Sequence, residues 1–336
     1  MAGPVHPARG VSYPVTALFM VGVFLLGAAF IASYVGGLHA PHPHRVPVAV
    51  AGPADATARV DAALRREGDA FDLRTYPTTA SARQAIQHRD VYGAYLPQQG
   101  RLLITSAFGP TTSGLLRSAF APVAAADGLR LSVQDVVPAD PGDPEGLVPF
   151  YLVIGWIVSA YLVAAIVGLY RGMAAITLRD ALVRLAAFAV YSAVAGAMGT
   201  LIVETGYGYL PDSPWPLTGV GALCVFAVAA ATAAAESLLG IIGTALTILV
   251  FVVLGNPSAG GPWPLPLLPA FWRTAGPWPP NWAGTEAVRN AVYFDGHALT
   301  RPLLVLAAYA AAGIVLFLLL AGRTNPVMRF PAHSTA

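Results

Sequence analysis

The chain has 336 residues, of which 56% are hydrophobic and 11% are charged, and its mean hydropathy is +0.63. Soluble domains are about a quarter charged, so this composition excludes an ordinary soluble protein and indicates a polytopic α-helical membrane protein. All 19 basic residues are arginines and the net charge is +2, which excludes a P-loop or any other lysine-dependent chemistry and gives no case for nucleic-acid binding.

Apolar runs that could cross about 30 Å of hydrocarbon need roughly 17 to 25 residues. Six such runs are present, at 15–37, 149–170, 182–203, 217–235, 238–255 and 302–321. The first is longer than the core of a signal peptide and precedes a poor cleavage site, so we expect an uncleaved anchor. The sequence therefore predicts about six transmembrane helices, five of them in a domain over 149–322.

The distribution of arginine in the short segments predicts the orientation of the chain. One side of the membrane would hold Arg9, Arg171, Arg179, Arg184, Arg323 and Arg329. The opposite short loops hold fewer arginines. We therefore expect a multi-pass plasma-membrane protein whose N-terminal segment 1–14 and tail 323–336 are cytoplasmic.

Residues 41–146, between the first two spans, are richer in charge and are bounded by proline. Short strand-like runs alternate with segments of helical spacing in the order β-α-β-α-β-β-α-β, with a turn at Gln98-Gln99-Gly100. This pattern predicts an α/β domain inserted between the first and second helices. The expected orientation makes this domain extracytoplasmic.

The outer loop 256–300 is rich in tryptophan and proline. Amphipathic tryptophan rings prefer the membrane interface, so we expect the loop to lie there. Its segments LLPAFWRTAG and GTEAVRNAVYF are predicted to be short helices lying in or dipping into the interface. Non-helical backbone at that depth needs cover from protein or water.

Four segments resemble one family, the actinobacterial branch of the ABC-2 type transporter permeases, which is related to phage-infection-protein-like membrane proteins. They are VYGAYLP, DVVPADPGDPEG, LGNPSAGGPWPLPLLPAFWRTAGPWPP and AVRNAVYFDG. The family-like outer-loop motif comprises Gly255, Asn256, Pro257, Ser258, Gly260 and Gly261. The resemblance implies a permease subunit of an exporter that works as a dimer with separate ATPase subunits and moves lipids, polysaccharides, peptides or drugs outward.

A chain without lysine has no Walker A motif, so ATP would bind to a partner subunit. The link between the second and third spans would dock such an ATPase through Arg171, Arg179, Asp180 and Arg184. Alternatively, these arginines only enforce topology. A homodimer or a heterodimer is expected, and the i, i+4 pairs of small residues at Gly196 with Thr200 and Gly240 with Thr244 would permit close helix packing.

Two acidic residues lie at predicted span ends, Glu236 in a tight hairpin and Glu204 on the outer side. An acid inside a membrane suggests a polar functional site, whereas at an interface it caps a helix or meets water. We expect no catalytic residue, cofactor or metal on this chain. Two other functions stay open: an envelope anchor or receptor whose 41–146 domain binds a partner, and an intramembrane enzyme built on Ser258 with these acids.

Overall fold

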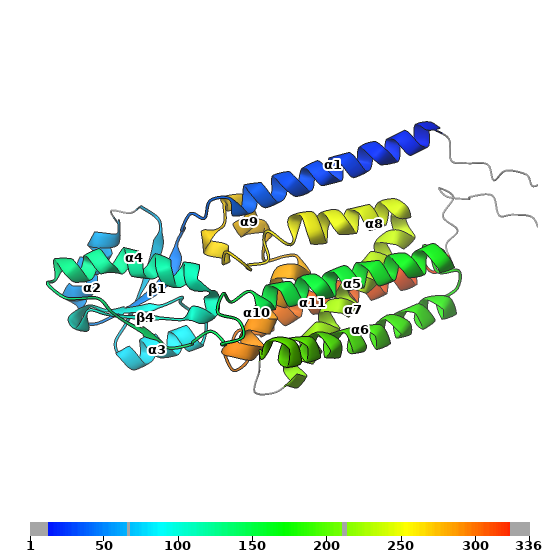
Figure 1. Ribbon diagram of the computed structural model, residues 1–336. Coiled ribbons are helices and arrows are strands. Elements are labelled where there is room, and N and C mark those ends of the chain that lie inside the picture. The colour runs from blue at the N-terminus through cyan, green and yellow to red at the C-terminus, as the bar shows by residue number, and fades with distance from the viewer. Residues whose placement is uncertain (1–12, 66–67, 210–213, 323–336) are drawn as a thin grey trace, which may run out of the picture.

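The computed structural model describes residues 13–65, 68–209 and 214–322. A mixed α/β unit forms one end of the molecule and a bundle of long helices forms the other (Figure 1). The segments predicted to be cytoplasmic, 1–14 and 323–336, lie outside the described residues except for positions 13 and 14. Arg9, Arg323 and Arg329 are therefore not described.

Five helices are long and apolar enough to cross a membrane, which is the construction of a multi-pass helical membrane protein. They are α1 (Tyr13–Leu38), α5 (Val148–Arg171), α6 (Leu178–Tyr207), α7 (Pro214–Leu239) and α11 (Thr300–Leu320). Each of these helices coincides with one of the predicted apolar runs and extends beyond it by a few residues at one or both ends.

The predicted span 238–255 does not form one long helix. The backbone turns at Gly240, whose φ is 65°, and restarts as the 8-residue helix α8 (Ile241–Ile248). The helix continues as six residues of π-helix, Leu249–Leu254. This apolar segment is shorter than the other five, so the described chain has five helices of spanning length and not the six that hydropathy alone predicts.

Helix α7 is at the centre of the bundle and packs against α5, α6 and α11. Its inner surface is made of small residues, which allow the neighbouring backbones to approach. A Cβ on Gly196 of α6 would lie 2.6 Å from the carbonyl oxygen of Thr218, and one on Gly313 of α11 would lie 2.6 Å from the backbone nitrogen of Ala231. The pair Gly196 and Thr200, considered above for dimer packing, is therefore used inside the chain.

The part of the chain that connects α1 to α5 forms a five-stranded sheet with strand order β2-β1-β3-β4-β5. The pair β3–β4 is antiparallel and the other pairs are parallel. The strands are β1 (Val46–Ala51), β2 (Phe71–Tyr76), β3 (Ala94–Leu96), β4 (Arg101–Ile104) and β5 (Ser132–Asp135). Helices α2 (Ala54–Leu64) and α4 (Pro110–Ala126) cover one face, and α3 (Thr79–Gln87) covers the other.

The order of these elements is the order that the sequence predicts. Gly100 supplies the left-handed residue, with φ 55°, that closes the β3–β4 turn at the predicted place. Helix α4 begins at Pro110, a residue suited to the first turn of a helix because its missing N–H costs nothing there.

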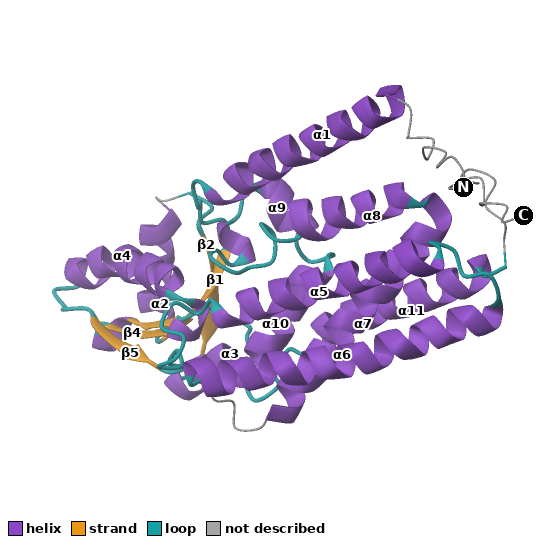
Figure 2. Ribbon diagram, turned by 45° about the vertical axis from the view of Figure 1, so that its right-hand side comes forward, coloured by secondary structure: helices purple, strands orange, loops and turns teal. Residues whose placement is uncertain are grey.

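The α/β unit is joined to the bundle by more than its two chain connections (Figure 2). The backbone N–H groups of His42 and His44 donate to the carbonyls of Leu267 and Pro266 in the outer loop. Leu267 inserts into the core between the sheet and α4, and Phe294 inserts into the core under α3. Residues far apart in sequence therefore complete both layers of this unit.

Candidate functional site

The short helix α10 (Pro280–Tyr293) carries the polar groups at the junction between the sheet unit and the bundle. It packs against α5, α7 and α11, and every residue from Pro280 to Asn290 is buried. Arg289 and Asn290 follow Glu286 by three and four residues, so the three side chains lie on the same side of the helix. A helix buried on all sides keeps such polar residues only if each finds partners.

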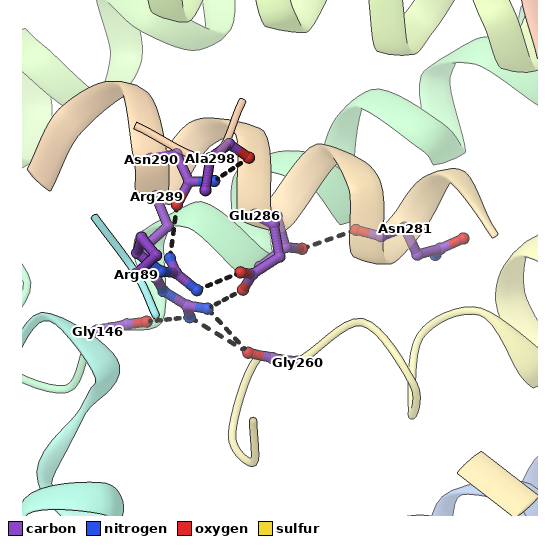
Figure 3. A network of polar contacts seen from close by, with 9 residues as sticks. Arg89, Gly146, Gly260, Asn281, Glu286, Arg289, Asn290 and Ala298 are labelled. Carbon is purple, nitrogen blue, oxygen red and sulfur yellow. Dashed lines mark hydrogen bonds and ion pairs between the residues drawn. The ribbon is translucent and has the colours of Figure 1, made fainter. Parts of the chain in front are cut away.

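Arg289, with 1% of its side chain exposed, belongs to an ion cluster that comprises Arg89, Glu286, Arg289 and Asn290 (Figure 3). Its Nη1 donates to Oε1 of Glu286 at 2.7 Å. The same guanidinium donates to the carbonyl of Gly260 at 3.2 Å and to that of Gly146 at 3.4 Å. One arginine of α10 thus ties together the outer loop and the segment that leads into α5.

Arg89 enters the ion cluster from the sheet unit. It follows α3 in the left-handed conformation, with φ 69°, which turns the chain towards the bundle. Its Nη2 donates to Oε2 of Glu286 and its Nη1 donates to Oδ1 of Asn290 at 2.6 Å. The guanidinium lies over two neighbouring rings, those of Phe108 and Phe294, 4.4 and 4.8 Å from their centroids. Stacking of this kind favours arginine over lysine.

The electrostatics of the cluster keep Glu286 ionised. Burial raises the pKa of its carboxyl, but the guanidinium groups of Arg89 and Arg289 outweigh burial and hold the pKa below its ordinary value. Burial also raises the pKa of nearby Tyr92 to about 12, so its phenol stays neutral. The cluster therefore carries two positive charges against one negative charge.

The outer-loop motif makes the second set of polar contacts. Asn281 of α10 donates to Oδ1 of Asn256 at 2.6 Å and to the carbonyl of Phe251 at 2.7 Å. Asn256 in turn donates to the hydroxyl of Tyr34 in α1 at 2.8 Å. This chain of hydrogen bonds connects α10 to the break after α8 and to the first helix.

The glycines of that motif are needed for close approach. A Cβ on Gly255 would lie 2.2 Å from Oδ1 of Asn281, and one on Gly261 would lie 2.3 Å from the ring of Phe150. Gly260 has φ 75° and presents its carbonyl to Arg289. The remaining members are also packed inside: Pro257 contacts α1 at Gly37, and the Ser258 hydroxyl donates to the carbonyls of Leu254 and Gly255.

The run DVVPADPGDPEG reaches the same junction. Asp143 accepts the N–H groups of Leu147 and Val148 at 2.8 and 3.0 Å and so caps the beginning of α5. Burial raises the pKa of the Asp143 carboxyl, and these two hydrogen bonds only partly offset that effect. Gly146 contributes its carbonyl to Arg289. All four sequence segments quoted for the family resemblance therefore reach the surroundings of α10, since VYGAYLP contributes Tyr92 near Glu286.

A cavity of about 260 Å³ opens beside the ion cluster. Its polar lining comes from both parts of the molecule: Arg89 and Tyr92 from the sheet unit, Trp282, Glu286 and Asn290 from α10, and Arg301 from the start of α11. In the described part of the chain, no group of three His, Cys, Asp or Glu side chains is placed to hold a metal ion.

The α5–α6 link lies at the other end of the bundle. Arg171 is 67% exposed and pairs with Asp180 at 3.3 Å, and Arg179 is also exposed. Arg184 is buried: it donates to the carbonyls of Gly172 and Arg171 at 2.6 and 2.9 Å and pairs with Asp180 at 2.8 Å. Arg184 and Asp180 thus hold the link in shape, whereas Arg171 and Arg179 present exposed cationic surface, with Arg171 also paired to Asp180.

The two acids proposed as a polar site are far apart. Glu236, near the end of α7, is buried, and its Oε1 accepts from the Thr244 hydroxyl at 2.7 Å. Glu204 is half-buried near the opposite end of the bundle, where Tyr207 of α6 approaches the segment 140–146. The structure does not bring these two carboxylates together, nor does it place either in the ion cluster.

Comparison of the chain with models of protein families, with curated proteins and with solved structures found no match. The ion cluster was not anticipated from the sequence, although AVRNAVYFDG contains two of its members. The available signal was a glutamate and an arginine three residues apart inside a segment otherwise poor in charge. Arg89 gave no such signal, because it lies almost 200 residues away.

Proposed function

We propose that this chain is the membrane-spanning permease subunit of an ABC-2-like exporter, which works as a dimer with a separate ATPase to move a substrate outward. In this proposal the sheet unit, residues 41–146, is extracytoplasmic, and the α5–α6 link faces the cytoplasm. The chain lies in the plasma membrane with both termini in the cytoplasm, as the arginine distribution indicates. The ATP would bind to the partner, because the chain has no lysine.

The observation that carries this proposal is the attachment of the sheet unit to the bundle. Through Arg89, Glu286 and Arg289 the unit is fixed to α10, and α10 packs directly on α5, α7 and α11. At the remote end, Ser237 of α7 donates to the carbonyl of Met173 in the α5–α6 link at 3.0 Å. A displacement of the link would therefore reach the sheet unit through packed helices, which suits an energy-coupled membrane subunit better than a tethered anchor.

The packing of the bundle supports a dimer. Ala229 and Ala230 on α7 are fully buried at the centre, so that helix occupies the space that a path within one chain would need. A transport path would then lie between two copies or between this chain and a related subunit.

The test is affinity purification in mild detergent, with mass spectrometry of co-purifying proteins and a subunit count from native mass. We expect a Walker-type ATPase at about one per permease. The R171E and R179E substitutions on the exposed link should release it, whereas R130E, a charge reversal on the exposed surface of the sheet unit, should not. A stable complex that lacks any ATPase would contradict the proposal.

A second candidate is an envelope anchor or receptor, favoured by the edge strand β5. All four of its residues are exposed, and an open edge can pair with an extended segment of another protein. The same purification separates the two functions. Recovery of envelope proteins that is lost when a proline replaces Val133, without any ATPase, would favour this reading.

A further inference from the structure

The cavity beside the ion cluster has a composition that points to a ligand. It lies where three elements meet: the α3–β3 turn of the sheet unit, α10, and the first turn of α11. Its walls combine the polar groups named above with the apolar Leu265 and Pro302. At about 260 Å³ it is large enough for a headgroup or a small anion and too small for a whole lipid.

The buried acids near this cavity are Glu286, which is shared between Arg89 and Arg289, and Asp143, whose carboxyl also interacts with Arg289. Arg301 adds a further positive charge. It stands with its guanidinium 5.1 Å from the ring centroid of Trp282, and it forms no ion pair with any acid in the described ranges. An anion is the ligand that would restore neutrality.

The cavity also lies beside the first turn of a helix that is long and apolar enough to cross a membrane. Arg301 is the second residue of α11, a helix of 21 residues that is apolar enough to cross a membrane. The beginning of such a helix is at the level of lipid headgroups, where tryptophan and arginine side chains are favoured. Arginine is suited to phosphate there, because its planar group can donate two hydrogen bonds to one oxyanion.

We propose that this cavity binds the phosphate group of an anionic amphiphile at the membrane boundary, with Arg301 as the main ligand and Arg89 as the second. The acyl chains would lie outside the cavity along α11. Free inorganic phosphate offers the same oxyanion chemistry from a soluble source. This proposal follows from the charge and the position of the cavity, and it does not require the chain to be a transporter.

The test uses the full chain purified in mild detergent and titrated with dioleoylphosphatidylglycerol, with native mass spectrometry to count bound lipid. Zwitterionic dioleoylphosphatidylcholine provides the reference for non-specific lipid. We expect saturable binding of phosphatidylglycerol that R301Q weakens at least about ten-fold, the loss expected for a charge-assisted hydrogen bond. R301E should abolish it, and R301K, which keeps the charge but loses the planar pair of donors, should fall between the unmodified chain and R301Q.

The matched control is R273Q, which removes an arginine that lies in the outer loop preceding α11 and does not line the cavity. Arg301 is exposed and donates no hydrogen bond within the described residues, so its variants should unfold at the same denaturant concentration as the unmodified chain. Excess inorganic phosphate, at matched ionic strength, identifies the source: displacement of the lipid assigns the site to a free oxyanion, and no displacement assigns it to a lipid headgroup. Equal affinity for phosphatidylglycerol in the unmodified, R301Q and R301E proteins would overturn the proposal.

Discussion

Replacement of Glu286 by glutamine tests whether the ion cluster holds the sheet unit on the bundle. The change keeps the side-chain shape but removes the one carboxylate within residues 13–65, 68–209 and 214–322 that both Arg89 and Arg289 contact. Arg89 and Arg289 have 9% and 1% of their side chains exposed, so two buried guanidinium groups lose their counter-ion. Breaking a buried ion pair in this way costs about 3–5 kcal/mol.

The assay is equilibrium unfolding of the purified protein by urea in mild detergent. D61N is the matched control, because Asp61 pairs with an Arg65 side chain that is 76% exposed. An exposed i, i+4 pair contributes only about 0.3–0.5 kcal/mol. R89Q alone should cost less than E286Q, since Glu286 keeps Arg289 as a partner. The double variant should show a coupling energy of about 2 kcal/mol.

Hydrogen exchange locates the effect. In the E286Q protein we expect faster exchange in the α3–β3 turn and around Phe294, while the middle of α7 stays protected. If E286Q proves as stable as D61N, the cluster is not a counter-ion for the two arginines. The sheet unit would then be held by apolar contacts such as those of Phe294, and the reasoning from buried charge would be refuted.

Three further predictions follow from the described contacts. The pKa of Glu286 in the folded protein is held below its ordinary value of 4.5, so the ionised carboxylate contributes fully to stability above pH 4.5. This contribution is lost as the pH falls through the folded pKa, and the urea midpoint should drop over that range. The E286Q protein should show a smaller drop. The substitution Gly196→Leu should destabilise the α6–α7 contact by about 1–3 kcal/mol in the same urea assay, whereas Gly206→Leu, where an added Cβ meets nothing within 4 Å, should not. Glu236→Ala removes a buried hydrogen bond to Thr244 and should lower the midpoint by the equivalent of about 1–3 kcal/mol, against little change for Glu204→Ala at a half-exposed position; equal midpoints for the last two variants would show that the Glu236 carboxyl is not held as the structure has it.

The sequence by itself determined where most helices and strands lie. Apolar runs of spanning length become long helices because a backbone in hydrocarbon must satisfy its own hydrogen bonds. The pattern of residues 41–146 similarly determined the order of strands and helices, because a strand covered on both faces, such as β1, is apolar throughout, whereas a helix such as α2 has one face to bury. Both features are local, so composition and periodicity reveal them.

Hydropathy was not sufficient for the segment 238–255. Its residues are apolar throughout, but Gly240 turns the chain, and a Cβ on Gly243 would lie 2.2 Å from the carbonyl of Ala235. The close return of the chain onto α7 shortens the helix that follows. Whether a glycine ends a helix or sits within it depends on such a contact, which no window of hydropathy contains.

The tertiary structure alone decided the ion cluster. Composition revealed the arginines and acids, but nothing in the sequence joins Arg89 to Glu286 and Asn290 across about 200 positions. The same holds for Arg184, which was expected as docking surface and instead binds two backbone carbonyls. A charged side chain has a role only through the partner that compensates its burial, and that partner is chosen when the chain folds.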